Sequence, residues 1–579
     1  MKVDHMKESP HGIRSDAYSP VFMGRNGAVV TNHWLASQAG TQTLQRGGNA
    51  VDAAVAIGFA LTVVEPQSSG IGGDGFVMVY MRDTAVIEVA NGTGAAPLAA
   101  SVAEYRDGIP EKGVRSISVP GIVDALLSAH ERFGQISLLE CLEPSIMMAE
   151  QGVPISHRQA IDVSRDPLIC SFPTSKAIWA PQDRPPSAGE IVRNPDLAAT
   201  MRRIAQEGRE GFYMGGIASE IVRFTQEHGG LLTEEDFARH RVQWQEPIKT
   251  TYRERIVYEA PPNSTGNVLL QELNILECFE ESLLRPVTTD AIHIMAEAKR
   301  LCFADREAYL ADPRFVDIPI EGLLSKGYAA DRARLIDPDR RTDDPNAGDA
   351  WAYEPIGRSP RDGLVSAKAA RQYRHPEVVG DTTYFAVVDR WGNAVSELQS
   401  IQMGWGSGVV AGRTGILMNN RMTTWHLEPD HPNVLKPGKR VRHTMNPVMV
   451  FSAPPAEGGR LELVCGTPGG DTQVQTNMQV LSAVLDHGFT VSEATAMTRW
   501  THLQNPMISS IPHTTHDALQ IESRAPKELI DGLQGKGHNV ERLGPWGGPG
   551  SIGMIQAHSE SGAYMAAADP RRDGLASAW

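Results

Sequence analysis

A polar stretch at residues 337–376 divides the chain into two parts that each mix helical and strand patterns. The stretch is rich in Asp, Arg, Pro and Gly and has little apolar periodicity, which is typical of an exposed linker. Helices and strands on both sides of the linker need apolar partners, and sheets covered by helices provide them. We therefore predict a mixed α/β (α+β) fold with a larger part before the linker and a smaller part after it.

Before the linker the pattern is mainly helical. Asn49 is a good N-cap for an almost continuously apolar helix that Pro66 ends. Other helices are expected at 34–46, 121–134, 197–207 and 289–310, and strands at 27–31 and 76–81.

After the linker strands come first and helices return later. Strands are expected at 382–389, 394–402, 415–420, 446–451, 461–466, 551–558 and 563–569, and helices at 474–488 and 492–500.

Charge and cysteine usage exclude several classes of protein. The net charge of −15 argues against nucleic acid or an anionic membrane as a partner, although a local basic pocket still suits an anionic small substrate. The first 20 residues lack the apolar segment of a signal peptide, and no apolar run reaches membrane-spanning length. The 5 cysteines form no C-x-x-C pair, which favours buried free thiols in a reducing compartment. We expect a cytoplasmic protein.

Two patterns suggest ligands but have simpler explanations. Residues 70–75 match G-x-G-x-x-G, yet a helix precedes them and a strand follows, the reverse of a dinucleotide-binding turn. His293 and Glu297 lie one helical turn apart, but no second histidine at metalloprotease spacing accompanies them. We expect a glycine-rich turn and an ordinary pair on a helix face, with neither a cofactor nor a metal ion.

The first two strands after the linker form a predicted hairpin around residues 390–393. Gly392 can adopt the positive φ that such a turn needs. A turn centred near Trp391 makes Thr382 and Ser400 cross-strand partners, at roughly 5 Å between Cβ atoms, so their hydroxyls are within reach of a hydrogen bond. An ordinary Thr–Ser pair explains this as well, but the position of Thr382 directly after the linker favours a chemical role.

Cleavage between Asp381 and Thr382 would make the threonine a new N-terminus. Its α-amino group, with a pKa of about 7.7–8.0, takes the hydroxyl proton while Oγ attacks a carbonyl. The resulting oxyanion needs backbone N–H donors. Gly469 and Gly470, in the turn after the strand at 461–466, present such donors without side-chain hindrance, although a plain tight turn is an alternative.

Several long segments, in order, resemble the γ-glutamyltranspeptidase family from about Gly27 to the C-terminus. The segments before the linker are RGGNAVDAAVA (46–56), EPQSSGIGGDGF (65–76), APPNSTG (260–266) and MAEAKRLCFADREAYLADP (295–313). Those after it are GDTTYFAVVD (380–389), GILMNNRM (415–422), GTPGGD (466–471) and AADPRRDG (567–574). The resemblance implies a four-layer αββα sandwich of the N-terminal-nucleophile hydrolase type.

The resemblance also implies self-cleavage into a large subunit, 1–381, and a small subunit, 382–579, which remain associated and are compatible with an oligomer of heterodimers. Thr382 matches the nucleophile of the family. Ser400 falls where the family has a supporting threonine, and Gly469 and Gly470 match the oxyanion-hole glycines.

The residues that hold a γ-glutamyl group in typical members differ here. The segment at 90–97 has no arginine for the α-carboxylate. Arg421 replaces a glutamine and Thr424 replaces an aspartate. In typical members this glutamine and this aspartate hold the α-amino group. His443 and Thr444 replace a serine pair, and the stretch from 424 to 440 leaves little room for a lid loop. An arginine at position 421 favours a substrate carboxylate instead, with a structural pair to an acid of the chain or a position in solvent as alternatives.

This pattern is closer to the cephalosporin-acylase-like and oxamate-amidohydrolase-like branch of the family. Our main hypothesis is hydrolysis of a small amide whose acyl group carries a carboxylate, through a threonyl acyl-enzyme, with Arg421, His443 and Thr444 in the substrate pocket. A first alternative is γ-glutamyl hydrolysis or transfer on glutathione-like substrates in a rearranged pocket. A second is an uncleaved, non-catalytic binding protein, although Thr382 and the glycines are intact.

Overall fold

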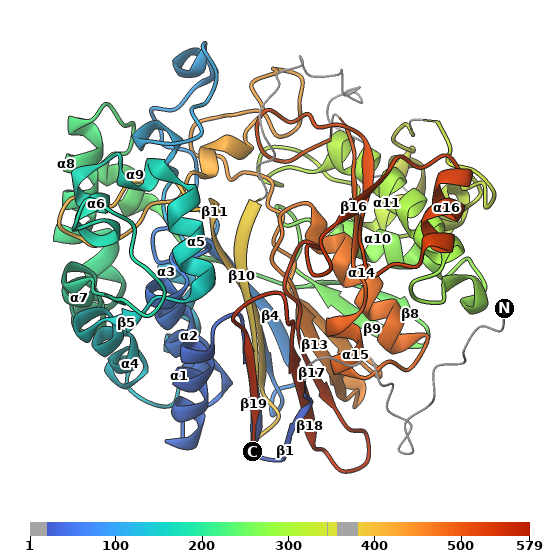
Figure 1. The fold of residues 1–579 in the computed structure, drawn as a ribbon, viewed down its shortest axis with the longest axis horizontal. Coiled ribbons are helices and arrows are strands. Elements are labelled where there is room, and N and C mark those ends of the chain that lie inside the picture. The colour runs from blue at the N-terminus through green and yellow to red at the C-terminus, as the bar shows by residue number, and fades with distance from the viewer. Residues whose placement is uncertain (1–19, 344, 356–379, 506) are drawn as a thin grey trace.

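The computed structural model of the chain describes residues 20–343, 345–355, 380–505 and 507–579. Within these ranges two seven-stranded sheets stack face to face, and helices cover the outer side of each sheet (Figure 1). The largest apolar clusters lie between the two sheets and between each sheet and its helices. The predicted four-layer αββα sandwich is therefore confirmed.

Both large sheets are antiparallel. The first contains, in spatial order, β1 (Phe22–Gly24), β18 (Tyr564–Ala568), β17 (Gly553–Ala557), β13 (Leu461–Gly466), β12 (Val448–Phe451), β9 (Arg255–Glu259) and β8 (Ile248–Tyr252). The second contains β19 (Leu575–Ala578), β2 (Gly27–Thr31), β10 (Gly380–Asp389), β11 (Ala394–Met403), β3 (Asp74–Met81), β4 (Val86–Asn91) and β7 (Gln243–Gln245). Strands from before and after residue 381 share both sheets, so a division there separates the sequence but not the core.

Helix α2 shows how the sequence builds the outer layers. The Asn49 side chain accepts the backbone N–H of Asp52, and the Asp52 carboxylate accepts that of Asn49. This capping box fixes the start of the helix, which ends at Val64, directly before the segment that contains Pro66. The helices against or near the second sheet are α1 (Trp34–Gln45), α2 (Ala50–Val64), α3 (Ile122–Phe133), α4 (Leu138–Gln151), α7 (Pro195–Tyr213) and α8 (Gly216–Glu227). Those on the side of the first sheet include α10 (Gly266–Leu276), α11 (Thr289–Tyr309), α14 (Thr472–Leu485) and α15 (Val491–Ala496).

Shorter elements complete the described part of the chain. The remaining helices are α5 (His157–Arg165), α6 (Pro173–Trp179), α9 (Glu234–Arg239), α12 (Ile320–Leu323), α13 (Lys326–Ala333) and α16 (Lys527–Gly535). The strands β14 (Trp500–Leu503), β15 (Ala518–Glu522) and β16 (Val540–Leu543) form a small sheet, and β5 (Val153–Pro154) pairs with β6 (Ile191–Val192). Across the described ranges, the helices fall short of the length and apolar character that a membrane span needs.

Two predicted elements differ from the structure. Residues 415–420 form no regular strand, because the chain turns with positive φ at Gly412 and Gly415 and its backbone bonds go partly to the same loop and partly to Gly72 and Ile401. The helix expected at 492–500 ends at Ala496, and β14 begins at Trp500, because the polar groups around Arg499 bond to the neighbouring strand β15.

The polar stretch after residue 336 is also less exposed than expected. Ala350 is buried, and Thr342 donates to the carboxylate of Glu297. The part of the predicted linker at 356–376 lies outside the described residues. The cysteines are free, as expected; Cys141, Cys302 and Cys465 are buried, whereas Cys278 is exposed.

Candidate active site

Thr382 lies near the start of β10, beside Ser400 of β11. The register pairs Thr383 with Gln399, as the predicted turn requires, and a bulge lies directly before Thr383. Ser400 in turn pairs with Asp74, the first residue of β3. Thr382, Ser400 and Asp74 therefore follow one another across three adjacent strands.

The hydroxyl of Thr382 is buried among hydrogen-bonding groups. It lies 2.7 Å from the carbonyl oxygen of Asp381 and 3.2 Å from Oγ of Ser400. The Ser400 hydroxyl donates to the same carbonyl oxygen at 2.8 Å and accepts the backbone N–H of Gln402 at 2.8 Å. The hydrogen bond expected between Thr382 and Ser400 is thus present, and both hydroxyls converge on the bond that the sequence analysis marked for cleavage.

Arg572 holds the chain on both sides of this bond. Its Nη2 donates to Oδ1 of Asp381 at 2.6 Å, and its Nη1 donates to the Thr382 carbonyl at 3.0 Å and to Glu65 at 2.9 Å. Asp381 also accepts the hydroxyl of Ser68 at 2.9 Å and the backbone N–H of Thr382 at 3.0 Å. Burial opposes ionisation of Asp381, but Arg572 and Arg158 hold the pKa of its carboxyl below the usual value.

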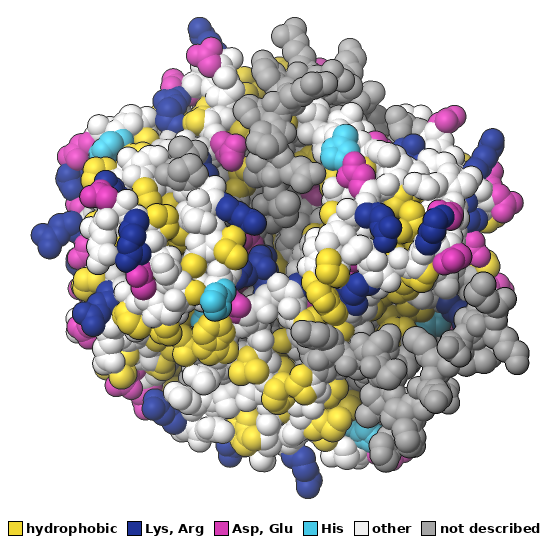
Figure 2. Space-filling view, viewed as in Figure 1, with side chains coloured by type: hydrophobic (Ala, Val, Ile, Leu, Met, Phe, Trp, Pro, Cys, Tyr) yellow, Lys and Arg dark blue, Asp and Glu magenta, His cyan; other side chains and the backbone are white. Residues whose placement is uncertain are grey.

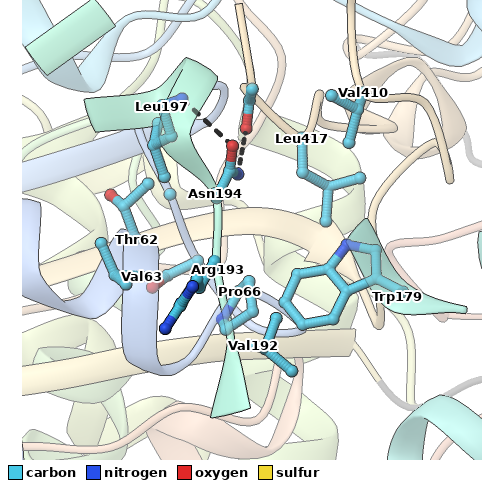
Figure 3. A pocket seen from close by; sticks show the side chains of 13 residues that line it. Thr62, Val63, Pro66, Trp179, Val192, Arg193, Asn194, Leu197, Val410 and Leu417 are labelled. Atoms are coloured by element: carbon cyan, nitrogen blue, oxygen red, sulfur yellow. Dashed lines mark hydrogen bonds between the residues drawn. The ribbon is translucent and has the colours of Figure 1, made fainter. Parts of the chain in front are cut away.

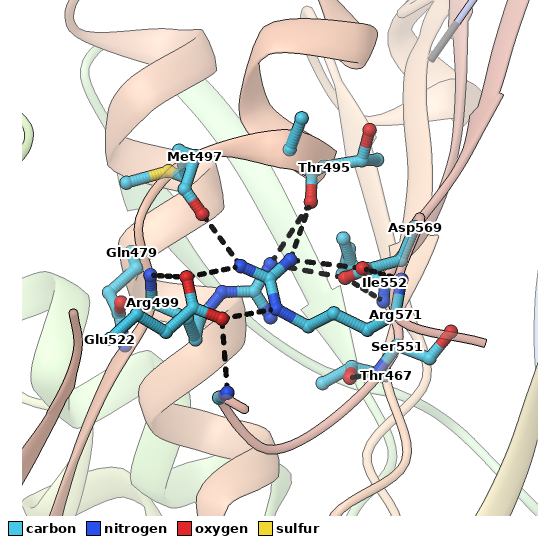
Figure 4. A network of polar contacts seen from close by, with 12 residues as sticks. Thr467, Gln479, Thr495, Met497, Arg499, Glu522, Ser551, Ile552, Asp569 and Arg571 are labelled. Carbon is cyan, nitrogen blue, oxygen red and sulfur yellow. Dashed lines mark hydrogen bonds and ion pairs between the residues drawn. The ribbon is translucent and has the colours of Figure 1, made fainter. Parts of the chain in front are cut away.

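A second ion-pair network fixes the segment that carries Arg572 (Figure 4). The Arg571 guanidinium donates to both oxygens of Glu522 at 2.8 Å and to Asp569 at 2.9 Å. Arg499 donates to the other oxygen of Asp569 at 3.2 Å. These bidentate contacts restrict the backbone next to Arg572 and so help to hold its side chain beside the Asp381–Thr382 bond.

The glycine-rich segment at 70–75 packs against this site. A Cβ atom on Gly73 would lie 2.2 Å from the carbonyl oxygen of Ser400, and one on Gly72 would lie 2.2 Å from that of Leu417. Real Cβ atoms do not approach so closely, so only glycine fits. The G-x-G-x-x-G pattern is a close-packing turn, as expected, and it places Asp74 at the start of β3.

Arg421 is 1% exposed and pairs with Asp74. Its Nε lies 3.2 Å from Oδ2 of Asp74, and its Nη1 donates to the side-chain oxygen of Gln402. Burial lowers the pKa of Arg421 to about 10, so the guanidinium stays protonated at neutral pH. Of the alternatives that the sequence left open for Arg421, the structure shows the pair with an acid of the chain, Asp74, and Nη2 has no hydrogen-bond partner among the described residues.

Beside the Arg421–Asp74 pair, His443 and Thr424 add further buried polar atoms without a hydrogen-bond partner among the described residues. His443 is fully buried, its Nε2 lies 3.5 Å from Oδ2 of Asp74, and its Nδ1 has no partner among the described residues. Burial and the nearby Arg421 lower the pKa of His443 to about 4, so the ring is neutral. The Thr424 hydroxyl is also unfilled, and Thr424 follows Arg421 by three residues in a 3-10 turn, which puts both on one face. Buried polar atoms are rarely left unpaired, so this cluster marks a place for water or ligand.

Three other predicted residues and one predicted pair can be located in the structure. Gly469 and Gly470 form the turn between β13 and α14, with φ of +130° and +58°, and the described hydrogen bonds of Thr382 do not include them. Thr444 is buried next to His443. His293 bonds to His538 and to the Asp337 carbonyl, whereas Glu297 bonds to Arg300 and Thr342, so the pair shares no ligand position.

Two clusters have the composition of a metal site. In the first, formed by Asp52, His130 and Cys141, the Asp52 carboxylate already accepts the backbone N–H groups of Asn49 and Gln135. The second is formed by Glu307, His426 and His431. The rings of His426 and His431 are stacked, 3.5 Å apart and 6° from parallel. Parallel rings direct their nitrogen lone pairs side by side and not toward one ion. Glu307 is already paired with Arg306 and Arg442. Stacking and ion pairs explain the cluster without a cation.

Two cavities in the described part of the chain differ in how open they are: one is small and enclosed, and the other is open to solvent. A cavity of about 20 Å³ next to Pro66, lined mainly by apolar side chains such as Trp179 and Leu417, has room for about one water molecule (Figure 3). An open groove of about 450 Å³ is lined by α5 and by residues 570–573, including Arg158, Arg165 and Arg572. Lys and Arg side chains also border the hollow in the middle of the face in Figure 2. Arg572 therefore lies at the wall of an open groove that Arg158 and Arg165 also line.

Comparison with known proteins identifies the family. The profile described as gamma-glutamyltranspeptidase matches residues 36–579. The chain belongs to the γ-glutamyltranspeptidase family. It is 35% identical over 559 residues to the glutathione hydrolase-like YwrD proenzyme of Bacillus subtilis, covering 96% of this chain and 98% of the relative. It is 32% identical over 541 residues to the acylase ACY 1 proenzyme of Pseudomonas sp. (strain V22), covering 90% of this chain and 88% of the relative.

A solved structure shares the whole fold of this γ-glutamyltranspeptidase family member. The crystal structure of cephalosporin acylase from Bacillus halodurans matches with a TM-score of 0.84 and 33% identity, over 100% of this chain and 99% of that one. The chain is thus an N-terminal-nucleophile hydrolase of the γ-glutamyltranspeptidase family, with both glutathione hydrolases and acylases among its relatives.

The sequence analysis of this γ-glutamyltranspeptidase family member missed three residues of the site: Glu65, Asp74 and Arg572. Their contacts join segments that are far apart in the sequence, and no local spacing predicts them. A signal existed all the same, because each is a charged residue inside a segment that resembles the family, EPQSSGIGGDGF or AADPRRDG.

Proposed function

We propose that the chain cleaves itself before Thr382 and then uses Thr382 to hydrolyse a small amide whose acyl group carries a carboxylate. One observation carries this proposal: the Thr382 and Ser400 hydroxyls both lie within hydrogen-bond distance of the Asp381 carbonyl oxygen. The relatives named as proenzymes and as an acylase support the same reading.

Self-cleavage follows from these contacts. Oγ of Thr382 attacks the carbonyl carbon of Asp381, and the Ser400 hydroxyl donates to the developing oxyanion at the oxygen it already contacts. Arg572 fixes the residues on both sides of the bond during the attack. The C–N bond breaks, the Thr382 nitrogen takes the hydroxyl proton and becomes an amine, and Asp381 is left as an ester on Oγ. Water then hydrolyses this ester and releases Asp381 as a carboxylic acid and Thr382 as a free N-terminus.

Turnover repeats this chemistry on a substrate. The new α-amino group accepts the proton of Thr382 Oγ, which attacks the substrate amide, and the amine leaves with that proton. Water hydrolyses the ester and restores the hydroxyl. Gly469 and Gly470 supply backbone N–H groups for the oxyanion in this proposal, in a turn at the start of α14 whose dipole also favours negative charge.

The buried polar cluster beside Asp74, formed by Arg421, Thr424 and His443, suits a small polar acyl group. Arg421 Nη2 and the Thr424 hydroxyl have no hydrogen-bond partner among the described residues, and donors of this kind bind carbonyl or carboxylate oxygens. Since Asp74 neutralises Arg421, this cluster offers hydrogen bonds more than net positive charge.

A second candidate, γ-glutamyl hydrolysis, is favoured by Asp74. Position 424, where typical members have an aspartate, is a threonine here. Asp74, two strands away from Thr382, supplies a carboxylate that can pair with an α-ammonium group instead. Glutathione turnover that Asp74→Asn abolishes would support this candidate over the first.

The test compares three purified proteins: wild type, Thr382→Ala and Thr382→Ser. We expect wild type and Thr382→Ser to separate into 1–381 and 382–579 on a denaturing gel, and Thr382→Ala to remain one band. Intact mass spectrometry during turnover of an acidic amide should show an acyl adduct on the small subunit of wild type. Cleavage of Thr382→Ala at the same bond, or a wild type that stays intact, contradicts the proposal and favours a non-catalytic protein.

A further inference from the structure

A loop between β14 and β15, residues 509–513, lies against the turn that carries Arg421 and Thr424. The backbone N–H of Ile511 donates to the carbonyl oxygen of the residue before Thr424 at 2.9 Å. The ring of His513 lies 3.1 Å from the carbonyl oxygen of the residue after Thr424. We call this loop the strap. It holds the chain on both sides of Thr424, whose hydroxyl has no hydrogen-bond partner among the described residues.

The strap also reaches the second donor of the polar cluster, Arg421, through Gln402. Oγ of Ser510 accepts Nε2–H of Gln402 at 2.7 Å, and Oε1 of the same amide accepts Nη1–H of Arg421. Nε of Arg421 is committed to Asp74, so Nη2 is the donor left for a ligand. The strap therefore fixes the backbone beside one free donor and the direction of the other.

Ile511 covers the apolar side of this turn. Its side chain packs against a cluster that contains Met422 and Trp425, the sequence neighbours of the two donors. Arg421 and Thr424 are each 1% exposed, so an acyl group that reaches them fills enclosed space. Protein interiors are close-packed, and one added methylene forces a neighbouring side chain to move. We expect a longer acyl group to displace Ile511, because this residue belongs to a loop and not to a sheet.

The other end of the strap holds the glycine turn. Ser509 donates its backbone N–H at 2.8 Å and its hydroxyl at 2.5 Å to the two oxygens of Asp471. Asp471 is the N-cap residue of α14 and directly follows Gly469 and Gly470, which supply the oxyanion donors in the proposed function. Because Ser509 and Ile511 are two residues apart, a displacement of one moves the other. The strap thus joins the acyl pocket to the oxyanion donors through a short piece of chain.

We propose that the strap sets the length of the acyl group, with Ile511 as the specificity-determining side chain and Ser509 as a positioning residue. An acyl group that fits leaves the strap in place and keeps the Ser509–Asp471 contact. One methylene more pushes Ile511 outward, loosens that contact and moves the oxyanion donors away from the attacked carbonyl. A longer acyl group is therefore rejected in kcat as well as in KM. The inference rests on the proposed function and adds the part of the site that selects the substrate.

The first experiment measures kcat/KM of the self-cleaved proteins on straight-chain dicarboxylic monoamides, from oxamate to adipamate. The wild type should have a best length and lose activity beyond it. One methylene in a fitted pocket is worth about 10- to 200-fold, so Ile511→Ala should raise kcat/KM for the amide one methylene longer by about tenfold or more, relative to the best wild-type substrate.

Ile508→Ala is the matched control. It makes the same change directly before the strap, and Ile508 is not among the described residues of the cluster around Met422 and Trp425. This variant should keep the wild-type profile. A flat wild-type profile, an unchanged profile in Ile511→Ala, or the same shift in Ile508→Ala overturns the inference.

The second experiment separates kcat from KM and tests Ser509. Ser509→Ala removes a hydrogen bond to a charged carboxylate and should lower kcat for the best amide by about tenfold. The kcat for the amide one methylene longer should fall much less, because its acyl group has already loosened this contact in the wild type. Ser509→Thr keeps the hydroxyl and should restore the wild-type difference. If Ser509→Ala lowers both kcat values equally, Ser509 only supports the fold and the inference is wrong.

Failure of the proposed function has a different signature. A wild type that stays one band on a gel, or that hydrolyses neither these amides nor γ-glutamyl amides, contradicts the proposed function and this inference with it. If only γ-glutamyl amides react, asparagine and glutamine repeat the length comparison, because their acyl groups differ by one methylene. A cleaved and active enzyme without a length limit contradicts the role of the strap alone.

Discussion

Two buried arginines flank Thr382, and each pairs with an acid from the same segment, residues 65–76. Arg572 pairs with Glu65, and Arg421 pairs with Asp74. Arg572 also binds a second acid, Asp381, which lies on the other side of the bond expected to break. Arg421 has no second acid among the described residues, and its Nη2 is unfilled.

This difference separates a temporary contact from a permanent one. In the proposed self-cleavage, the Asp381–Arg572 contact belongs to the intact chain and serves maturation. The Asp74–Arg421 contact is part of the fold, and its removal affects stability before it affects binding. Each of the following predictions tests one side of this comparison.

The largest effect is expected at Arg421. Breaking a buried ion pair by removing one partner costs about 3–5 kcal/mol, because the other charge remains buried and unpaired. Arg421→Gln should therefore lower the free energy of unfolding by about that amount, measured by chemical unfolding on the Thr382→Ala background. The double variant Asp74→Asn/Arg421→Gln removes both charges and should recover most of the loss. Equal losses of unfolding free energy in the single and double variants would show that the buried Asp74 carboxylate is stable without Arg421 as its partner.

Ser400 should show the next largest effect. Its hydroxyl donates to the Asp381 carbonyl oxygen, where negative charge develops during self-cleavage. Loss of one such donor lowers the rate by about 100-fold or more. Ser400→Ala should slow the appearance of the two bands on a denaturing gel by that factor. Ser396→Ala removes a buried hydroxyl from the same strand, bonded to Tyr384, and is the matched control that should cleave at the normal rate.

The charge of Asp381 should have a somewhat smaller effect. Hydrogen bonds to charged groups contribute about 1.5–3 kcal/mol, which is about 10- to 150-fold in rate. Asp381→Asn keeps the shape of the side chain but weakens its contacts with Arg572 and Ser68. We expect self-cleavage to slow within that range in a time course. Asp162→Asn makes the same change in the nearby groove, and a slowing as large as that of Asp381→Asn would show that general charge, and not the clamp, controls the rate.

The sequence predicts the main geometry of the site but not its electrostatics. The Thr382–Ser400 contact follows from a two-residue periodicity and one turn, both of which are local properties. The contacts of Arg572 with Asp381 and of Arg421 with Asp74 join residues 191 and 347 positions apart. Such contacts depend on how the two sheets assemble, and charge alone does not indicate which acid an arginine meets. The prediction of a strand at 415–420 failed for a related reason. The apolar pattern of this loop is satisfied by packing and not by the hydrogen-bond ladder of a sheet.

The smallest effect concerns pH and the permanent side of the comparison. Burial beside Arg421 lowers the pKa of His443 from 6.5 to about 4, so the folded chain keeps this ring neutral. The unfolded chain binds a proton on this histidine below pH 6.5, and therefore the stability that His443 contributes is full above about pH 6.5 and is lost as pH falls toward 4. By linkage, lowering the pH from 8 to 5 should remove about 2 kcal/mol through this residue alone. We expect the difference in unfolding free energy between pH 8 and pH 5 to shrink by that amount in His443→Asn on the Thr382→Ala background. The exposed His558→Asn is the control, because its ring is in solvent. If both variants keep the pH dependence of the parent, the ring is hydrated or already charged in the fold, and the cluster around Asp74 is then open to water and not sealed by Arg421.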